Sequence, residues 1–300
     1  MRMSIFATLF GIAAVAACGG GGMTADDVVG DDVVGDDAPP TGFQPFVAGD
    51  WTLQPNEEGY YCVRATATEE MYIKAFRPIA PLGTHHTALA IDTQGGPDGG
   101  FPCTAGDTGF KLLFGSGLGT TPYSLPDGVA FKLEAGTQVM LNLHLYNTTD
   151  AIMQGHSGIE IERIAQADVV HEAETIYALD FNVVVPTGES TYPASCTING
   201  DSTIVGLFPH MHRLGTHMKA TAMHAGAPTV IHDAAYSFGE QLNYAVDPIQ
   251  VLDGDTIDFE CGYYNDTGAT VVFGDSSDDE MCVLGMYRYP ATGGVSLCFE

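Results

Sequence analysis

The stretch TQVMLNLHLY, residues 137–146, alternates apolar side chains with others along its length. Its valine and three leucines share one face of an extended chain, because successive side chains of a β-strand point to opposite sides. The pattern therefore predicts a strand whose apolar face joins a core. His144 belongs to the other face, so the sequence predicts that its imidazole points toward the surface or a cleft.

Short β-rich runs recur along the chain between turn residues. They cover residues 59–66, 71–76, 110–114, 175–185 and 255–263. Gly occurs 37 times and Pro 16 times, and no long amphipathic helix is evident, so we predict an all-β fold. The roughly 258 residues after position 42 suit two tandem antiparallel β-sandwich domains better than one oversized sandwich. We expect these domains at residues 43–168 and 169–300.

The charge balance excludes one class of partner. The chain has 10 Lys and Arg against 38 Asp and Glu, which gives a formal net charge of −28. Such a field repels phosphate backbones and anionic lipid headgroups. We therefore expect no nucleic-acid partner.

The first residues follow the pattern of a bacterial lipoprotein signal. Arg2 precedes an apolar run over 5–14, and the small-residue sequence VAAC follows at 15–18. This pattern predicts a signal peptide over 1–17 and a lipid on Cys18 that attaches the protein to a membrane. The alternative is an ordinary signal peptide that happens to contain a cysteine. Both predict export, and we place the mature protein in the bacterial cell envelope, facing the periplasm or the cell surface.

Residues 18–42 combine glycines with a repeated DDVVG motif and then DAPP. The segment has no large side chains to bury, and its acidic charge keeps it extended, so it predicts a linker between the lipid and the folded part. A calcium site at the paired aspartates is an alternative to plain solvation.

Cysteine usage agrees with export. Apart from Cys18, six cysteines remain: Cys62, Cys103, Cys196, Cys261, Cys282 and Cys298. Disulfides form in oxidising compartments, and an even number allows all six to pair. Six cysteines permit 15 pairings, and their spacing alone does not select one.

Two histidine pairs are candidate metal ligands. His210 and His212 share a face of an extended strand while Met211 points away, so both imidazoles can bind one metal ion. His85 and His86 are adjacent, and adjacent residues of a straight strand point to opposite faces. Joint ligation requires a bend, which the preceding PLGT segment could supply. For each pair there is an alternative without a metal. His210 and His212 could be surface or hydrogen-bonded histidines, and of His85 and His86 one could lie in the core and the other in solvent.

Met281 ends the acidic turn DSSDDE at residues 275–280. The end of an acidic turn is not an obvious core position, and a thioether is a soft ligand suited to Cu(I). The carboxylates of the turn offer two other interpretations, a calcium site or a solvated surface turn.

Taken in order, these motifs resemble those of the copper type II, ascorbate-dependent monooxygenases. The resemblance covers about residues 60–300, and it depends on His85-His86, on His144 within LHLY, on His210-x-His212 before Gly215, and on DEMC at 279–282. It implies two jelly-roll-like β-sandwiches that each hold one copper ion through three side chains. The implied ligands of the first copper are His85, His86 and His144. Those of the second copper are His210, His212 and Met281.

The same resemblance implies a pairing of the cysteines. The implied disulfides are Cys62–Cys103, Cys196–Cys298 and Cys261–Cys282. The last of these would hold the neighbouring Met281 in place.

The implied activity is that of a copper-dependent monooxygenase. Such an enzyme hydroxylates a C–H bond of a small organic substrate with O₂ and a two-electron reductant such as ascorbate. We expect two copper ions per chain, with His210, His212 and Met281 as the catalytic set.

The expected substrate pocket departs from that of the peptide-amidating members. In those members an Arg, an Asn and a Tyr hold the peptide carboxylate, and here the matching positions are Phe208, Val283 and Gly285. The pocket is therefore expected to be apolar. A negatively charged chain also attracts anions poorly, so an uncharged or cationic small molecule is expected.

Two other functions remain open from the sequence. The first is a non-catalytic copper-binding or carrier lipoprotein, which would use the same ligands without oxygenating a substrate. The second is a metal-free surface β-sandwich that binds glycans or proteins, in which case the ordered His and Met motifs are coincidental.

Overall fold

A computed structural model describes residues 41–107, 111–293 and 297–298. The predicted signal peptide, Cys18 and nearly all of the predicted linker lie outside the described residues. Within these ranges the regular structure is β-strand apart from one 3-10 turn at Gln166–Asp168, which confirms the all-β prediction. None of the described segments forms a helix long and apolar enough to span a membrane.

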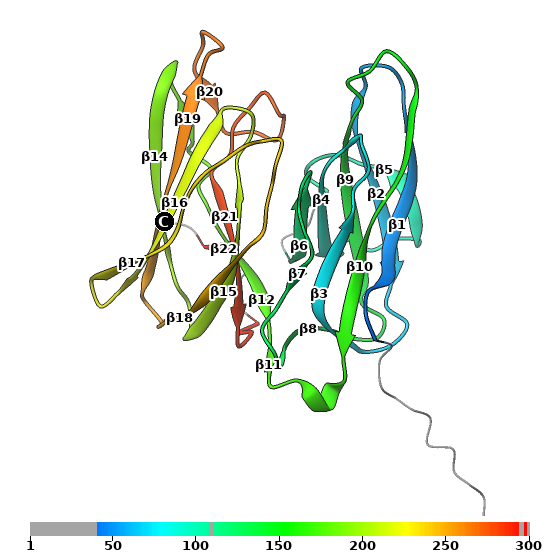
Figure 1. The fold of residues 1–300 in the computed structure, drawn as a ribbon, viewed down its shortest axis with the longest axis vertical. Helices are drawn as coiled ribbons and strands as arrows, with labels where there is room; N and C mark the ends of the chain where they lie inside the picture. Colours follow the sequence, from blue (N-terminus) through cyan, green and yellow to red (C-terminus); the bar gives the residue numbers. More distant parts are fainter. Residues whose placement is uncertain (1–40, 108–110, 294–296, 299–300) are drawn as a thin grey trace, which may run out of the picture. The chain divides into compact units, whose positions relative to one another are not determined.

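Strands β1 to β11 form two sheets, which Figure 1 shows in blue to green. One has the order β1-β10-β3-β8-β11, with β7 beside β3, and the other has the order β5-β2-β9-β4-β6. Their bounds are β1 Gln44–Leu53, β2 Glu58–Thr66, β3 Met71–Ile79, β4 Thr84–Ile91, β5 Gly99–Pro102, β6 Leu112–Gly117, β7 Tyr123–Ser124, β8 Val129–Leu133, β9 Gln138–Tyr146, β10 Met153–Ile164 and β11 His171–Glu172. Apolar side chains from both sheets share one core, so the pair is a sandwich.

Strands β12 to β22 form the other sheets, in green to red in Figure 1. Their orders are β18-β15-β21-β12-β22 and β14-β19-β16-β17, with the short pair β13-β20 beside them. Their bounds are β12 Glu174–Leu179, β13 Val184–Val185, β14 Gly188–Thr197, β15 Ser202–His210, β16 Gly215–His224, β17 Ala227–Ala235, β18 Tyr244–Val251, β19 Thr256–Asn265, β20 Val271–Val272, β21 Val283–Tyr289 and β22 Leu297–Cys298. Every sheet lies wholly on one side of residue 173, and the domain limits predicted from the sequence stay predictions.

The prediction of one continuous strand over residues 175–185 is wrong, because the structure has two shorter strands there. The chain leaves β12 at Leu179 and re-enters a strand only at Val184. The side chain of Asp180 accepts a hydrogen bond from the backbone N–H of Asn182 at 2.7 Å. Such a local bond stabilises a turn in place of the strand ladder, which explains the break.

Strand β9 has the predicted alternation. Its valine and leucines at odd-numbered positions 139–145 are at most 1% exposed and belong to the core of the first sandwich. The opposite face is also covered, because Met140, Asn142 and His144 are buried. The His144 side chain thus lies in the interior, not at the surface or in a cleft as predicted, because distant segments cover this face of the strand.

The apolar core of the first sandwich continues into the second. Val205, Phe208 and Tyr287 from the second sandwich pack in the same cluster as the first core. The Tyr123 ring stacks on Tyr287 with centroids 4.5 Å apart, and its hydroxyl donates to the carbonyl of Val205 at 3.2 Å. This contact joins the two sandwiches within one compact unit.

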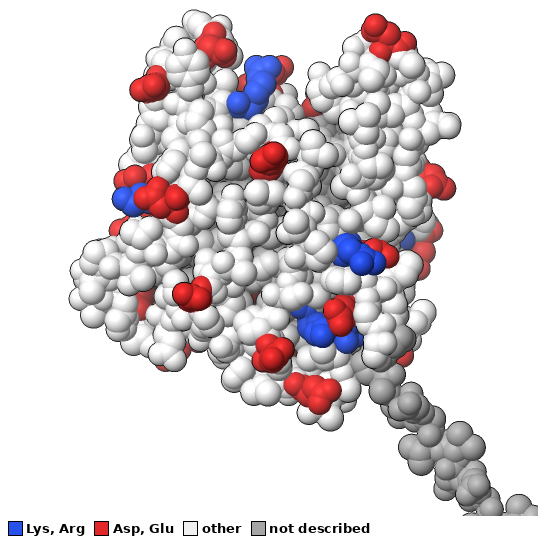
Figure 2. Space-filling model, in the orientation of Figure 1, with Lys and Arg blue, Asp and Glu red and all other residues white. Residues whose placement is uncertain are grey.

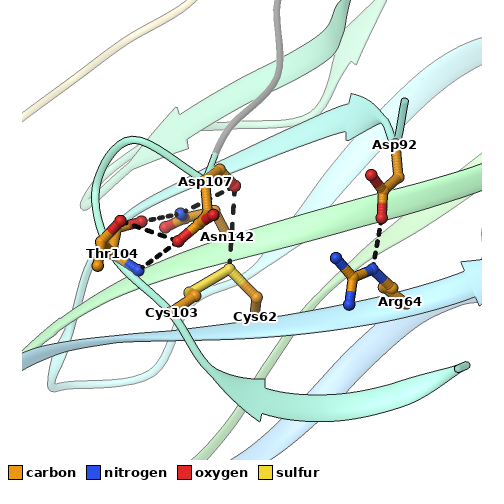
Figure 3. The surroundings of a disulfide bond; sticks show 7 residues. All are labelled: Cys62, Arg64, Asp92, Cys103, Thr104, Asp107 and Asn142. Carbon is orange, nitrogen blue, oxygen red and sulfur yellow. Dashed lines mark hydrogen bonds and ion pairs between the residues drawn. A yellow bond between two sulfur atoms is a disulfide. The ribbon is translucent and has the colours of Figure 1, made fainter. Parts of the chain in front are cut away.

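Three disulfides link the described cysteines, and all three pairs are those that the resemblance implied. They are Cys62–Cys103, Cys196–Cys298 and Cys261–Cys282. Figure 3 shows the first, where Asn142 donates to the carbonyls of Thr104 and Asp107 beside the bridge. The bridge and these hydrogen bonds hold the segment after β5 against the central strands β2 and β9.

Two loops with the same hydrogen-bond pattern lie after β9 in the first sandwich and at the end of β19 in the second. In the first loop, the Asn147 amide donates to two backbone carbonyls, and Thr149 donates to its Oδ1 through both N–H and hydroxyl. Asn265 and Thr267 make the matching set of bonds in the second. The two sandwiches therefore share a local plan around these strands.

Charged side chains are sparse on the face drawn in Figure 2, where uncharged surface predominates and red carboxylates outnumber blue basic groups. Elsewhere in the described residues, arginines form ion pairs with acids, as in Arg64–Asp92 and Arg213–Asp278. The acidic excess of the sequence is therefore visible as scattered carboxylates on this face.

Candidate metal centre

His85 and His86 lie at the start of β4, where the strand departs from regular pairing. The register between β4 and β9 shifts by one residue between Thr84 and His86, and His86 then lies opposite His144. An extra residue in one strand bends it and re-aims its side chains. This bulge at His85 gives the two adjacent imidazoles a common side, as the sequence argument required.

Three imidazoles converge at this bulge. The Nδ1 atom of His86 lies 3.2 Å from Nδ1 of His85 and 3.3 Å from Nδ1 of His144. One ligand atom from each of the three lies within 4.8 Å of the others. The structure thus brings together the three residues of the first predicted set. Converging ring nitrogens of this kind fit a transition-metal ion of imidazole preference, such as copper.

Burial keeps these imidazoles neutral. It lowers the pKa of His85 to about 4 and that of His86 well below the ordinary value, and neighbouring imidazoles lower both further. Burial also lowers the pKa of His144, against the opposing effect of Glu58. A metal ion binds only an unprotonated ring nitrogen, so the three side chains are in the state that ligation needs.

Glu58 and Tyr60 on β2 position the His144 ring. Oε1 of Glu58 lies 2.7 Å from Nε2 of His144, and the Tyr60 ring stacks on the imidazole at 4.5 Å between centroids. Burial acts to raise the pKa of Glu58, but its hydrogen bonds with His144 and Ser277 outweigh burial and lower it. The carboxylate therefore accepts the Nε2 proton, which leaves Nδ1 of His144 free for a metal.

His210 and His212 lie at the end of β15 and just after it, with ring centroids 5.3 Å apart. Met211 between them is fully buried in the second core, but β15 ends at His210, so the pair does not lie on one continuous strand as predicted. Nδ1 of His210 lies 2.9 Å from Oε1 of Gln241, and Nδ1 of His212 lies 3.2 Å from the carbonyl of Asp279. Since these acceptors take the Nδ1 protons, both rings keep an unprotonated Nε2 for a metal.

Met281 is held beside this second pair by its neighbour Glu280. The buried carboxyl group of Glu280 accepts hydrogen bonds from the backbone N–H groups of His212 at 3.0 Å, Leu214 at 2.6 Å and Met281 at 3.3 Å. Met281 lines the same cavity as His210 and His212. Glu280 therefore fixes the histidine loop and the methionine segment to one another, together with the bond from His212 to the carbonyl of Asp279.

The two histidine sets come close to each other. The rings of His86 and His210 lie 5.7 Å apart between centroids. Phe238, from the loop after β17, lies 4.1 Å from the His85 ring and 6.0 Å from the His212 ring. The second sandwich thus supplies an aromatic side chain that contacts both sets.

His217 in the second sandwich occupies the position that matches His86 in the first, but the described residues form no metal-ligand set around it. His217 lies opposite Gly262 in the β16–β19 pair, as His86 lies opposite His144, and each histidine follows a one-residue register shift. Gly262 offers no ligand, and Nε2 of His217 is 2.9 Å from the Asp233 carboxylate. The second set is therefore built elsewhere, at the end of β15.

Four residues of this region were not identified from the sequence as parts of the site. They are Glu58, Tyr60, Phe238 and Gln241, and each contacts a ligand candidate. Glu58 and Tyr60 are two positions apart at the start of a predicted strand, so the sequence could have predicted that their side chains share a face. No sequence signal places the loop with Phe238 and Gln241 beside histidines about 30 to 150 residues away.

A cavity of about 500 Å³ adjoins both sets. It is lined by His86 from the first set and by His210, His212 and Met281 from the second. The rest of its wall is mainly apolar and comes from both sandwiches. A volume of this size accommodates a small organic molecule.

The C-terminal part of the chain matches a known domain family. The family is described as copper type II ascorbate-dependent monooxygenase, C-terminal domain, and the match covers residues 166–300. No curated protein sequence matches the chain.

Several solved structures align with the chain at very low similarity. The A223 turret protein of Sulfolobus turreted icosahedral virus is 8% identical, with a TM-score of 0.21 over 81% of this chain and 97% of its own. An archaeal virus protein described by its triple jelly roll fold and turret assembly is 10% identical, with a TM-score of 0.24 over 84% of this chain and 58% of its own. An infectious bursal disease virus structure, Gx strain, is 9% identical, with a TM-score of 0.23 over 86% and 76%. Scores this low carry no argument about fold or function.

Proposed function

We propose that the chain is a copper-dependent monooxygenase with one copper ion at each histidine set, and the match of residues 166–300 to the C-terminal domain of the copper type II ascorbate-dependent monooxygenases supports this. The observation that carries the proposal is the convergence of three neutral imidazoles, His85, His86 and His144, near the pair His210 and His212. The family match does not extend to the first set, so its geometry is an independent argument.

The donor atoms of each set fit copper. The first set offers three Nδ1 atoms, and the second offers two Nε2 atoms, with Met281 lining the same cavity as their histidines. Imidazole binds both oxidation states of copper, while a thioether favours Cu(I). When bound, copper would supply electron transfer and O₂ activation, with ascorbate or an equivalent as the two-electron donor.

The chain's own residues position these ligands and the substrate. Glu58 fixes the tautomer of His144, Gln241 fixes that of His210, and Glu280 holds His212 against Met281. The largely apolar walls of the adjoining cavity would contact a substrate beside the catalytic set His210, His212 and Met281. In the proposed reaction one oxygen atom of O₂ enters a substrate C–H bond, and two electrons and two protons convert the other to water.

We also propose that the protein is exported and attached to a membrane through lipidated Cys18. The signal-like pattern at residues 1–18 and the three disulfides support export to an oxidising compartment. Mass spectrometry of the mature N-terminus tests this, since a diacylglyceryl group on Cys18 is expected and a free or differently processed N-terminus would contradict it.

The experiment that tests the activity supplies ¹⁸O₂ and ascorbate to the copper-loaded protein with a panel of small organic substrates. We expect a product that gains one ¹⁸O atom and that requires both copper and reductant. The His212→Ala variant should lose this product, whereas His217→Ala, which removes a histidine outside both sets, should keep it.

A different result would favour the carrier function. If the protein binds copper but yields no labelled product from any class of substrate, the monooxygenase proposal is wrong. Transfer of that copper to a second apoprotein would then identify the chain as a carrier.

A further inference from the structure

We propose that the cavity beside the two histidine sets binds an uncharged, largely apolar small molecule, and that Phe208 and Val283 determine this preference. The inference rests on the proposed function, because it takes this cavity as the substrate site. It adds the chemical class of the substrate, which neither the ligand geometry nor the family match specifies.

The cavity has the size and the wall composition of a site for a small organic molecule. Its volume of about 500 Å³ is that of a site for a small organic molecule rather than a macromolecule. Ala88 and Leu112 from the first sandwich and Leu179, Phe208 and Val283 from the second are part of its wall. A ligand beside the imidazoles therefore contacts aliphatic and aromatic carbon on both sides, and burial of its own apolar surface is favourable.

The described residues of the cavity wall include no cationic side chain to neutralise an anion. Among them there is no lysine or arginine, and the polar groups, such as the buried Gln241 amide and Tyr177 hydroxyl, are uncharged. A carboxylate in this wall loses hydration without gaining a counter-charge from a side chain, which is unfavourable. The net charge of −28 acts in the same direction.

A cation is also poorly matched. The lining includes one carboxylate, Asp275, whose side chain is exposed to solvent. Away from Asp275, an ammonium group would have only uncharged partners, the aromatic faces and neutral polar groups of the described wall, to offset the loss of its hydration. An uncharged molecule has neither cost.

Phe208 owes its place on the wall to a glycine. A Cβ atom at Gly285, opposite Phe208 in the β15–β21 pair, would collide with the Phe208 ring. The ring also packs against Tyr177 at 5.4 Å and Tyr287 at 5.2 Å between centroids. It is therefore a fixed apolar surface, and the absent side chain at Gly285 makes room for it.

The test compares three ligands with one skeleton and different charge: 4-phenylbutan-1-ol, 4-phenylbutyrate and 4-phenylbutylamine. Their binding to the copper-loaded full chain is measured by isothermal titration calorimetry without reductant, with excess acetate present to occupy any anion position on the metal. We expect the alcohol to bind at least tenfold more tightly than either ion. Equal or tighter binding of the carboxylate or the amine, or no binding of the alcohol, would overturn the proposal.

Substitutions in the cavity wall test which residues determine the preference for an uncharged ligand. Val283→Lys places a cation in the wall and should shift the preference toward 4-phenylbutyrate, whereas Val272→Lys, at an exposed valine outside the lining, should leave it unchanged. Leu112→Lys tests the opposite wall if Val283→Lys does not fold. An unchanged preference in a folded wall variant would contradict the assignment. Because no turnover is measured, this result is independent of whether the protein incorporates ¹⁸O.

Discussion

Glu58 on β2 and His144 on β9 form a 2.7 Å hydrogen bond between Oε1 and Nε2 across adjacent strands. With its proton on Nε2, His144 presents an unprotonated Nδ1 to Nδ1 of His86, 3.3 Å away. The carboxylate thus selects the tautomer that places a donor atom in the first set.

Glu58→Gln should weaken copper binding at the first set. A glutamine can present its carbonyl oxygen to His144 but carries no charge, and loss of such a partner typically costs about 10- to 100-fold in metal affinity. Competition titration with a copper chelator measures the change. Glu189→Gln is the matched control, because Glu189 lies opposite Tyr264 in the second sandwich as Glu58 lies opposite Tyr146 in the first. Equal affinities in all three proteins would exclude a role for Glu58.

Glu280→Ala should destabilise the fold and disturb the second set. The substitution leaves the buried N–H groups of His212, Leu214 and Met281 without an acceptor, at a cost of roughly 2–4 kcal/mol in the free energy of unfolding. Urea denaturation of the copper-free protein measures it. Glu280→Gln should also destabilise, since its NH₂ group would face a backbone donor. A loss below 1 kcal/mol in both variants would show that other groups hold this loop.

Removal of the Cys261–Cys282 bridge should affect copper binding at the second set selectively. Replacing both cysteines by alanine releases Cys282, next to Met281, and removes a crosslink between residues 21 positions apart, worth about 3 kcal/mol. The Cys62–Cys103 double variant is the control, with a comparable loss of stability. Cu(I) affinity at the second set should fall in the former and persist in the latter, and the reverse pattern would contradict the role of the bridge.

His232 should make stability depend on pH. Burial lowers its pKa, with His217 acting in the same direction and Asp233 against it, and the ring packs on Tyr244. Since the unfolded side chain titrates near about 6.5, the unfolded state binds the proton first, and stability falls as pH decreases from there. Wild type should therefore lose more unfolding free energy between neutral and acidic pH than His232→Phe. Parallel pH profiles of the copper-free proteins would contradict this.

Local sequence patterns predicted much of the architecture. The alternation in residues 137–146 predicted β9 and its core face, because strand periodicity is a property of the residues themselves. It did not predict that the second face is also buried, which depends on covering by distant segments. The turn at Asp180 interrupts a run with the pattern of one strand, because the Asp180 side chain accepts hydrogen bonds from Asn182 that stabilise a turn there.

In the candidate site, too, local sequence predicted some features, while others depend on contacts between distant segments. The spacing of His210 and His212 indicated a shared target, and the adjacent His85 and His86 raised a geometric objection that only the bulge in β4 resolves. A bulge of this kind arises from pairing with another strand, so the single-strand pattern does not reveal it. The contact of Phe238 with His85 depends on the docking of the sandwiches, and that of Gln241 with His210 depends on the path of the loop between β17 and β18. Strand periodicity predicts neither contact.

The copper content of the purified full chain tests the central claim most directly. Elemental analysis should find two copper ions in the wild-type protein and one in each of His86→Ala and His212→Ala, because each variant removes a ligand from a different set. The double variant should retain none. A single copper ion in the wild type, or two ions in either variant, would contradict two separate copper sites built from these residues.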